Sequence, residues 1–190
     1  DRRVHGFAAV HAFATAGGTD VASLYDSAGN DTFFGNPTVG ALYGRGFYNR
    51  AKFFEQVHAI ATAGGNDVAR LFDSAGNDTF AANSVSGRLW GNGFSNRATF
   101  FDEVHAYATA GGNDVAKLFD SAGNDTFLAG PTGGTLFGAG FLNEAKSFEG
   151  LHAYATAGGH DVARLFDSPG SDTLVVTADS SALFGKGFYN

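Results

Sequence analysis

One unit of 47 residues is written four times in this sequence, and that repetition constrains the fold more than any local propensity does. The units divide as residues 3–49, 50–96, 97–143 and 144–190, and only Asp1 and Arg2 are left over. No linker separates the units, so we expect a single array running over residues 1–190. Because it is cut at unit boundaries, we expect a segment of a longer array. Two positions recur in every unit, an aspartate (Asp20, Asp67, Asp114, Asp161) and a histidine (His11, His58, His105, His152).

Alternating side chains within each unit predict short β-strands. In the second unit, residues 57–63 alternate small apolar side chains with His58, Ile60 and Thr62. Residues 67–73 alternate again, which places Ala69 and Leu71 toward the core and the variable position 70 toward solvent. Further strands are expected over residues 78–87 and 89–94, and the connector 95–103 is too short for a stable helix. The pattern therefore predicts an all-β protein with about four strands per unit, joined by tight Gly turns.

A single unit holds too few core side chains to fold alone. Fixing the backbone costs about 1–2 kcal/mol per residue, whereas burying a large apolar side chain contributes about 2–3 kcal/mol. Each unit must therefore bury its face against its neighbours. Glycine, at 28 residues, is placed periodically and marks turns, and the 20 phenylalanines need buried positions.

Two architectures are consistent with this repeat pattern. We expect a β-solenoid of four 47-residue units, similar to a parallel β-helix or β-roll, in which equivalent residues stack along a long axis. The alternative is a four-bladed β-propeller with each unit as one blade. The solenoid is favoured because the Ala-rich strands and Gly-Asn-Asp turns suit stacked rungs. It is also favoured because atypical residues occur at the two ends: Gly6 stands where Phe53 and Phe100 stand, and Pro169 and Ser171 alter the last turn.

The charge and the missing residue types narrow the function. The formal net charge of −7 argues against nucleic acid as a partner. With no Cys, the chain has no disulfides, thiolate metal sites or thiol nucleophile. The absence of both Cys and Met fits an extracellular or cell-surface location. No apolar run is long enough for a membrane helix, so we expect no membrane insertion.

The turns carry a resemblance to a known family. Gly64-Gly65-Asn66-Asp67-Val68 and Ala75-Gly76-Asn77-Asp78-Thr79-Phe80 resemble the Gly- and Asp-rich turns of RTX-type nonapeptide repeats. That resemblance implies a parallel β-roll, secretion, and calcium bound between successive turns. The whole unit also resembles the tandem repeats of very large secreted or surface proteins of bacteria.

Oxygen-bearing side chains gather in these turns, as Ca²⁺ requires. We expect the candidate calcium ligands to be Asp26, Asn30, Asp31, Asp73, Asn77, Asp78, Asp120, Asn124, Asp125, Asp167 and Asp172. The alternative is that these side chains cap their own turns by accepting hydrogen bonds from nearby backbone N–H groups.

Other recurring residues suggest further candidate sites. The four equivalent histidines could stack and bind Zn²⁺, or could lie on the wetter face of a strand. A triad of His58, Ser74 and Asp73 would place four active sites in tandem, so we expect no enzyme and no catalytic residues. Two aromatic-rich positions could form an interior ladder or an exposed glycan-binding platform: Tyr43, Trp90, Phe137 and Phe184, and Tyr48, Ser95, Leu142 and Tyr189.

The sequence therefore predicts a structural or adhesive repeat module, such as a stalk or filament segment of a secreted or cell-surface bacterial protein, with calcium as its candidate cofactor. Its expected partners are further copies of the array, joined end to end. The alternative is a lectin-like β-propeller that binds a glycan at one site per repeat.

Overall fold

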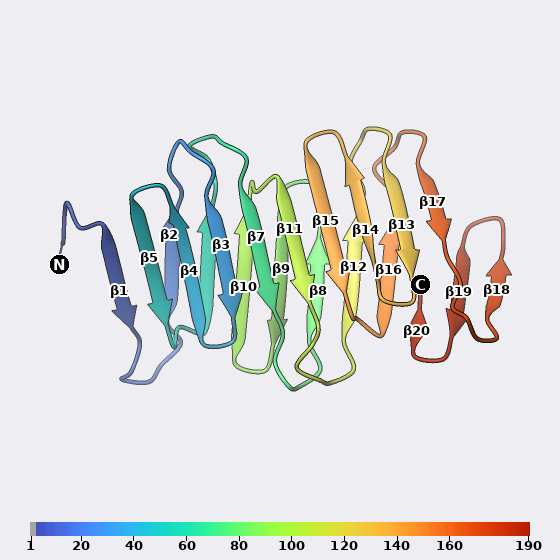
Figure 1. The fold of residues 1–190 in the computed structure, drawn as a ribbon, viewed down its shortest axis with the longest axis horizontal. Helices are drawn as coiled ribbons and strands as arrows, with labels where there is room; N and C mark the ends of the chain where they lie inside the picture. The colour runs from blue at the N-terminus through green and yellow to red at the C-terminus, as the bar shows by residue number, and fades with distance from the viewer. Residues whose placement is uncertain (1–2) are drawn as a thin grey trace.

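The computed structural model describes residues 3–190, and within that range it contains twenty β-strands and no helix. The strands form two ten-stranded sheets that lie face to face along one long axis, with the strands lying across that axis (Figure 1). Sheet A has the order β1-β5-β4-β3-β7-β11-β15-β14-β13-β17, and sheet B has the order β18-β19-β20-β16-β12-β8-β9-β10-β6-β2. This arrangement confirms the predicted β-solenoid and excludes the β-propeller.

Each unit supplies five strands. The first two units supply β1 (Ala9–Phe13), β2 (Val21–Tyr25), β3 (Thr32–Asn36), β4 (Val39–Gly44), β5 (Phe47–Lys52), β6 (Gln56–Ile60), β7 (Val68–Phe72), β8 (Thr79–Ala82), β9 (Ser86–Gly91) and β10 (Phe94–Thr99). The last two supply β11 (Glu103–Tyr107), β12 (Val115–Phe119), β13 (Thr126–Gly130), β14 (Gly133–Gly138), β15 (Phe141–Lys146), β16 (Gly150–Tyr154), β17 (Val162–Leu165), β18 (Thr173–Val176), β19 (Ser181–Gly185) and β20 (Phe188–Tyr189).

The prediction of about four strands per unit was therefore wrong by one. The range 78–87 contains a chain reversal between β8 and β9, because the Asn83 side chain accepts the N–H groups of Val85 and Ser86 at 2.9 and 2.8 Å. The expected connector 95–103 instead holds most of β10. Its alternation was hidden because the inward-facing residue Asn96 is polar.

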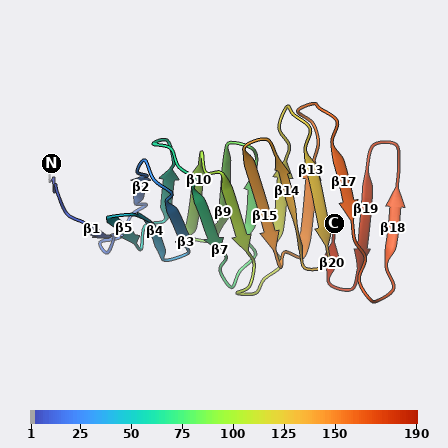
Figure 2. The same ribbon diagram turned by 45° about the horizontal axis from the view of Figure 1, so that its top comes forward.

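Successive units enter opposite sheets. In the second unit β6 lies in sheet B, β7 in sheet A, and β8, β9 and β10 form an antiparallel meander in sheet B; β11 then begins the next unit in sheet A. The chain thus changes sheet an odd number of times per unit, so the structure repeats every two units. Figure 2 shows the strands following one another along the long axis from β1 at one end to β18 at the other. The expected stacking of equivalent residues was wrong. Val68, for example, lies between Thr32 and Glu103, which belong to different parts of the unit.

The core lies between the two sheets. The predicted inward residues Ala69 and Leu71 are fully buried, whereas Arg70 between them is exposed. Phe33, Phe80 and Leu118 are also fully buried. Each inward face thus alternates large side chains with alanines, which allows the two sheets to interdigitate closely.

Asparagine side chains tie the two sheets together across the interior. The Asn96 amide donates to the Asn36 carbonyl at 2.9 Å, and Asn143 repeats the bond to Asn83 one unit later. Both amides are buried, so the bond satisfies polar groups that would otherwise cost about 1–3 kcal/mol each. Asn190 makes the same contact with Gly130 at 3.1 Å.

The link between units contains a left-handed residue. Phe53, Phe100 and Ser147 have φ values of 64°, 65° and 64°, and the equivalent Gly6 has 75°. The glycine that interrupts the phenylalanine pattern at the first unit therefore occupies a backbone conformation that suits glycine best.

Candidate functional site

Aspartates gather at the turns that join the two sheets. After β7, the turn between Asp73 and Asp78 is closed by the Asp78 carboxylate, which accepts the backbone N–H and the hydroxyl of Ser74 at 2.7 and 2.8 Å. The same bonds link Asp31 to Ser27, Asp125 to Ser121 and Asp172 to Ser168. The predicted capping of turns by these side chains is thus present in every unit.

The next turn along the axis contributes a third carboxylate. Asp67 accepts the N–H of Asp31 at 2.8 Å, Asp114 that of Asp78 at 2.7 Å, and Asp161 that of Asp125 at 2.9 Å. Within the described chain, two groups bring one carboxylate oxygen from each of three residues within 4.8 Å of one another: Asp26, Asp31 and Asp67, and Asp120, Asp125 and Asp161.

The structure brings together some of the predicted ligands and not others. It joins Asp26 with Asp31 and Asp120 with Asp125, as expected from their shared turn. The asparagines do not join them: Asn30, Asn77 and Asn124 each accept an exposed backbone N–H of the next turn at 2.9 Å. Among the described residues, neither the pair Asp73 and Asp78 nor the pair Asp167 and Asp172 belongs to such a group.

The aspartate that each of these turns receives from the next turn was missed at the sequence level. Asp67, Asp114 and Asp161 stand at the position whose exact repetition defined the unit, and that repetition was the available signal. The sequence could not show that each of these aspartates lies beside the turn 36 residues earlier. Which turns are neighbours depends on the number of strands per unit.

At these turns, neighbouring carboxylates lie close enough to repel one another. Burial raises the pKa of Asp114 to about 6, against the opposing effect of the hydrogen bond from Asp78, and the charges of Glu149, Asp78 and Asp73 raise it further. Burial likewise raises the pKa of Asp67, and Asp26, Asp31 and Asp102 add to the shift. A proton or a cation beside Asp114 or Asp67 would relieve the repulsion.

The donor set is one that a hard cation accepts, because it consists of carboxylate oxygens. Several of these oxygens already accept donors from the protein: Asp31 from Ser27, Asp67 from Asp31, and Asp26 from the Ala63 N–H at 2.8 Å. A Ca²⁺ ion needs six or more oxygens, so water would have to supply the remainder. Calcium binding here stays a prediction.

The equivalent histidines do not form the ladder considered as a zinc site. Consecutive copies lie in opposite sheets: His11 and His105 in sheet A, His58 and His152 in sheet B. His105 instead contacts Glu144 at 2.6 Å and Glu103 at 3.0 Å. Burial opposes ionisation of Glu144, but hydrogen bonds from His105 and Lys146 outweigh it and lower the pKa of this carboxyl group.

The aromatic positions are likewise divided between the two sheets. Tyr43 and Phe137 lie in sheet A, whereas Trp90 and Phe184 lie in sheet B, so no single row contains all four. Their side chains are only partly covered and lie on the outer faces of the sheets. Where the second recurring position also holds an aromatic residue, the two rings stack. Tyr43 stacks on Tyr48 at 5.8 Å and Phe184 on Tyr189 at 5.8 Å.

The imagined triad is not assembled. The Ser74 hydroxyl donates to Asp78, and His58 lies on the outer face of β6, in the sheet opposite to β7, from which Asp73 and Ser74 follow.

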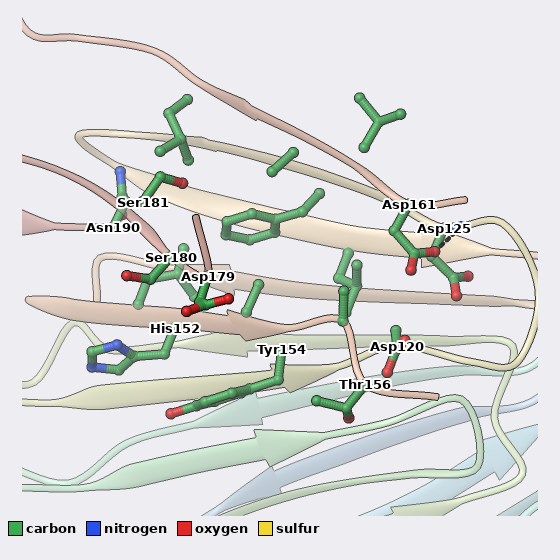
Figure 3. A pocket seen from close by; sticks show the side chains of 18 of the residues that line it. Asp120, Asp125, His152, Tyr154, Thr156, Asp161, Asp179, Ser180, Ser181 and Asn190 are labelled. Atoms are coloured by element: carbon green, nitrogen blue, oxygen red, sulfur yellow. Dashed lines mark hydrogen bonds between the residues drawn. The ribbon is translucent and has the colours of Figure 1, made fainter. Parts of the chain in front are cut away.

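Both ends of the solenoid leave core residues uncovered. At the C-terminal end a hollow of about 530 Å³ opens between the sheets, lined by Leu151, Ala163 and Leu165. The carboxylates of Asp120, Asp125 and Asp161 lie along one side of it (Figure 3). A smaller hollow at the N-terminal end is lined by Val10, Leu24 and Ala51, among other residues.

The fold and these sites define a two-sheet β-solenoid with aspartate-rich turns. Comparison of the chain with protein-family models, with curated proteins and with solved structures found no match. The described residues contain no helix that could span a membrane.

Proposed function

We propose that this chain is a structural module, a rigid stalk or filament segment of a secreted or cell-surface bacterial protein, which stacks end to end with further copies of the same array. The observation that carries the proposal is the complementarity of the two ends. The pairs inside the array predict that the ends fit in outline, in strand register and in the positions of their hydrogen-bonding groups.

The ends match in outline because the two sheets are staggered. At the N-terminal end β2 faces β4 and the inward residue Ala51 of β5 is still buried, whereas β1 of sheet A extends beyond sheet B. At the C-terminal end β18 is the last strand of sheet B and has the outermost position (Figure 1). Each overhang exposes the inner face of one sheet and lacks the opposite sheet, so two copies can overlap as a lap joint.

The strand register of this joint follows from the pairs inside the array. β17 is the copy of β7 two units later, and β1 is the copy of β11 two units earlier. Since Val68 pairs with Glu103 in parallel, Val162 should pair with Ala9 of the next copy. By the same rule Thr173 of β18 should pair with Val21 of the next copy, as Thr79 pairs with Val115. An even number of units also returns the chain to the sheet in which it began, so sheet A continues as sheet A.

Burial shows how much apolar surface the joint would cover. Leu174 and Val176 are 59% and 66% exposed, whereas their equivalents Phe80 and Ala82 are 0% and 2% exposed inside the array. Covering both side chains stabilises the joint by about 1–3 kcal/mol each. A following unit would cover both side chains as Phe80 and Ala82 are covered.

Three side-chain hydrogen bonds can continue across the joint. The Asp172 N–H would reach Asp20 of the next copy, as the Asp78 N–H reaches Asp114. Asp167 would accept the next Ala16 N–H, as Asp73 accepts that of Ala110, and the next Asn49 amide would reach the Thr177 carbonyl, following Asn143 and Asn83.

Two bonds cannot continue, because Ala8 and Ser171 replace the carboxylate and the asparagine of the internal pattern. We therefore expect a joint between copies to be weaker than a junction within the array.

The test is the association state of the 190-residue chain, followed by sedimentation velocity over a wide concentration range. We expect elongated oligomers that grow with concentration. Replacing Leu174→Lys should abolish them, since the charge would be buried at the joint. The control Val175→Lys, on the outer face of the same strand, should leave them intact. A wild-type chain that stays monomeric at the highest concentration, or two variants that behave alike, would overturn the proposal.

A further inference from the structure

We propose that the outer face of sheet B is a binding surface for an acidic polysaccharide, an extended chain of sugars that carries carboxylate groups. The inference is independent of end-to-end assembly. It depends on how charge is distributed over the two sheets, in a chain with 19 acidic and 12 basic residues.

Sheet B contains no carboxylate. None of its ten strands includes an aspartate or a glutamate, whereas sheet A carries Glu103 and Glu144. On sheet A these two acids contact basic groups, since Glu144 contacts both His105 and Lys146. The strands of sheet A also carry Arg50, Lys52, Arg70, Lys146 and Arg164, so the strands of the two sheets have the same net formal charge. Sheet B differs in that its basic side chains, Arg88, Arg97 and Lys117, share their sheet with no carboxylate.

The basic side chains of sheet B lie in one row. Strand register places His58 beside Arg97, Arg97 beside Arg88, and Lys117 beside His152, with Ala81 between Arg88 and Lys117. The row crosses six adjacent strands, which are about 4.8 Å apart, and it runs along the long axis of the solenoid. A linear polyanion could therefore follow it.

The two arginines in the middle of the row are held in position by neutral groups. Arg88 Nε donates to the Ser95 hydroxyl at 2.9 Å, and the guanidinium lies 4.8 Å from the centre of the Trp90 ring. Arg97 donates to the Ser86 hydroxyl at 3.4 Å. Among residues 3–190 neither arginine contacts a carboxylate, so both keep their charge for a ligand while losing little conformational freedom on binding.

The nearby histidine responds to the same positive field. Burial lowers the pKa of His58, and the charges of Arg97 and Arg88 lower it further. An approaching anion would reverse that effect.

An acidic glycan fits this surface better than a nucleic acid does. Aromatic rings accompany the row, with Trp90 beside Arg88 and the stacked pair Phe119 and Tyr154 near its other end, and flat rings suit the apolar faces of sugars. The turns at both margins of the sheet are rich in aspartate, and the net charge is −7, so a broad, densely charged duplex would meet repulsion. A single narrow chain along the middle row would avoid those margins.

The experiment measures binding of polygalacturonate oligosaccharides by titration calorimetry at low ionic strength, with neutral dextran and duplex DNA as comparison ligands. We expect polygalacturonate to bind and dextran not to bind, with affinity falling as salt is added. The double variant Arg88→Gln/Arg97→Gln should weaken binding at least about tenfold, since each arginine offers charge-assisted hydrogen bonds to a carboxylate.

The matched control is Arg70→Gln/Arg164→Gln, which removes the same charge from exposed positions in the middle row of sheet A. We expect this variant to bind as the wild type does. Three results would overturn the proposal: no binding by the wild type, equal losses in both double variants, or duplex DNA binding as tightly as polygalacturonate. Circular dichroism of each variant establishes that its fold is retained.

Discussion

The substitution Gly91→Ala probes the corner that every unit repeats. An alanine Cβ at this position would lie 1.6 Å from Asp78 Oδ1, 2.8 Å from Asp78 Cγ and 2.9 Å from a Phe94 ring carbon. No real Cβ tolerates such contacts, so the Asp78 carboxylate would have to leave its place. Gly44, Gly138 and Gly185 face the equivalent aspartate carboxylates of the other units.

The expected cost follows from the bonds that Asp78 would lose. Its carboxylate accepts the N–H and the hydroxyl of Ser74, and hydrogen bonds to charged groups contribute about 1.5–3 kcal/mol each. We therefore expect Gly91→Ala to lower the free energy of unfolding by about 3–5 kcal/mol. In the same turn, an added Cβ at Gly76 would meet only the Ser74 hydroxyl oxygen at 3.6 Å, so Gly76→Ala should be neutral or stabilising by about 0.4–1 kcal/mol.

Equilibrium unfolding in urea, followed by circular dichroism, measures both variants. A double-mutant cycle with Asp78→Ala identifies the cause. If the carboxylate is the obstacle, Gly91→Ala should cost little once Asp78 has been truncated. The reasoning is refuted if Gly91→Ala costs no more than Gly76→Ala, or if its full cost persists in the Asp78→Ala background.

Three other predictions concern charge and backbone strain. The folded state raises the pKa of Asp114 to about 6, so it binds the proton more tightly than the unfolded chain does, and the stability of the fold increases as pH falls from above 6 toward 4. Asp114→Asn should therefore be more stable than the wild type by about 2–3 kcal/mol near pH 7.5. In urea unfolding near pH 5 the variant should lose much of that advantage. If calcium fills the corners of Asp26, Asp31 and Asp67, adding it should raise the melting temperature in calorimetry and EDTA should reverse the rise, whereas an unchanged melting temperature removes calcium from the account. Ser147→Gly, at φ 64°, should raise the urea midpoint by relieving up to about 1 kcal/mol of left-handed strain, and a lowered midpoint would show that the conformation carries no such strain.

The sequence was sufficient to predict the class of fold and the faces of the strands. Period-two alternation placed Ala69 and Leu71 inside and position 70 outside, and both placements are confirmed. The repeated unit and its small core predicted that each copy must pack on the next. These properties depend on local alternation and on the amount of apolar surface, both of which can be read within one unit.

The path between the sheets could not be predicted in the same way. It depends on whether β8, β9 and β10 stay in one sheet, which is decided by the Asn83 turn and by the inward-facing Asn96. A buried asparagine resembles a surface residue in the sequence, so β10 was missed. Without β10, neither the neighbouring turns nor the contact between Asp67 and Asp31 could be predicted.

Disulfide formation between copies tests the lap joint most directly, because the chain has no cysteine of its own. We would introduce Ala9→Cys and Val162→Cys together and oxidise the chain mildly. Paired positions on adjacent strands lie within the 4.4–6.8 Å Cα separation that a disulfide accepts. The account predicts a ladder of linked oligomers, and almost none for the off-register pair Ala9→Cys and Arg164→Cys. Equal ladders from both pairs, or none from the first while the chains still associate, would contradict it.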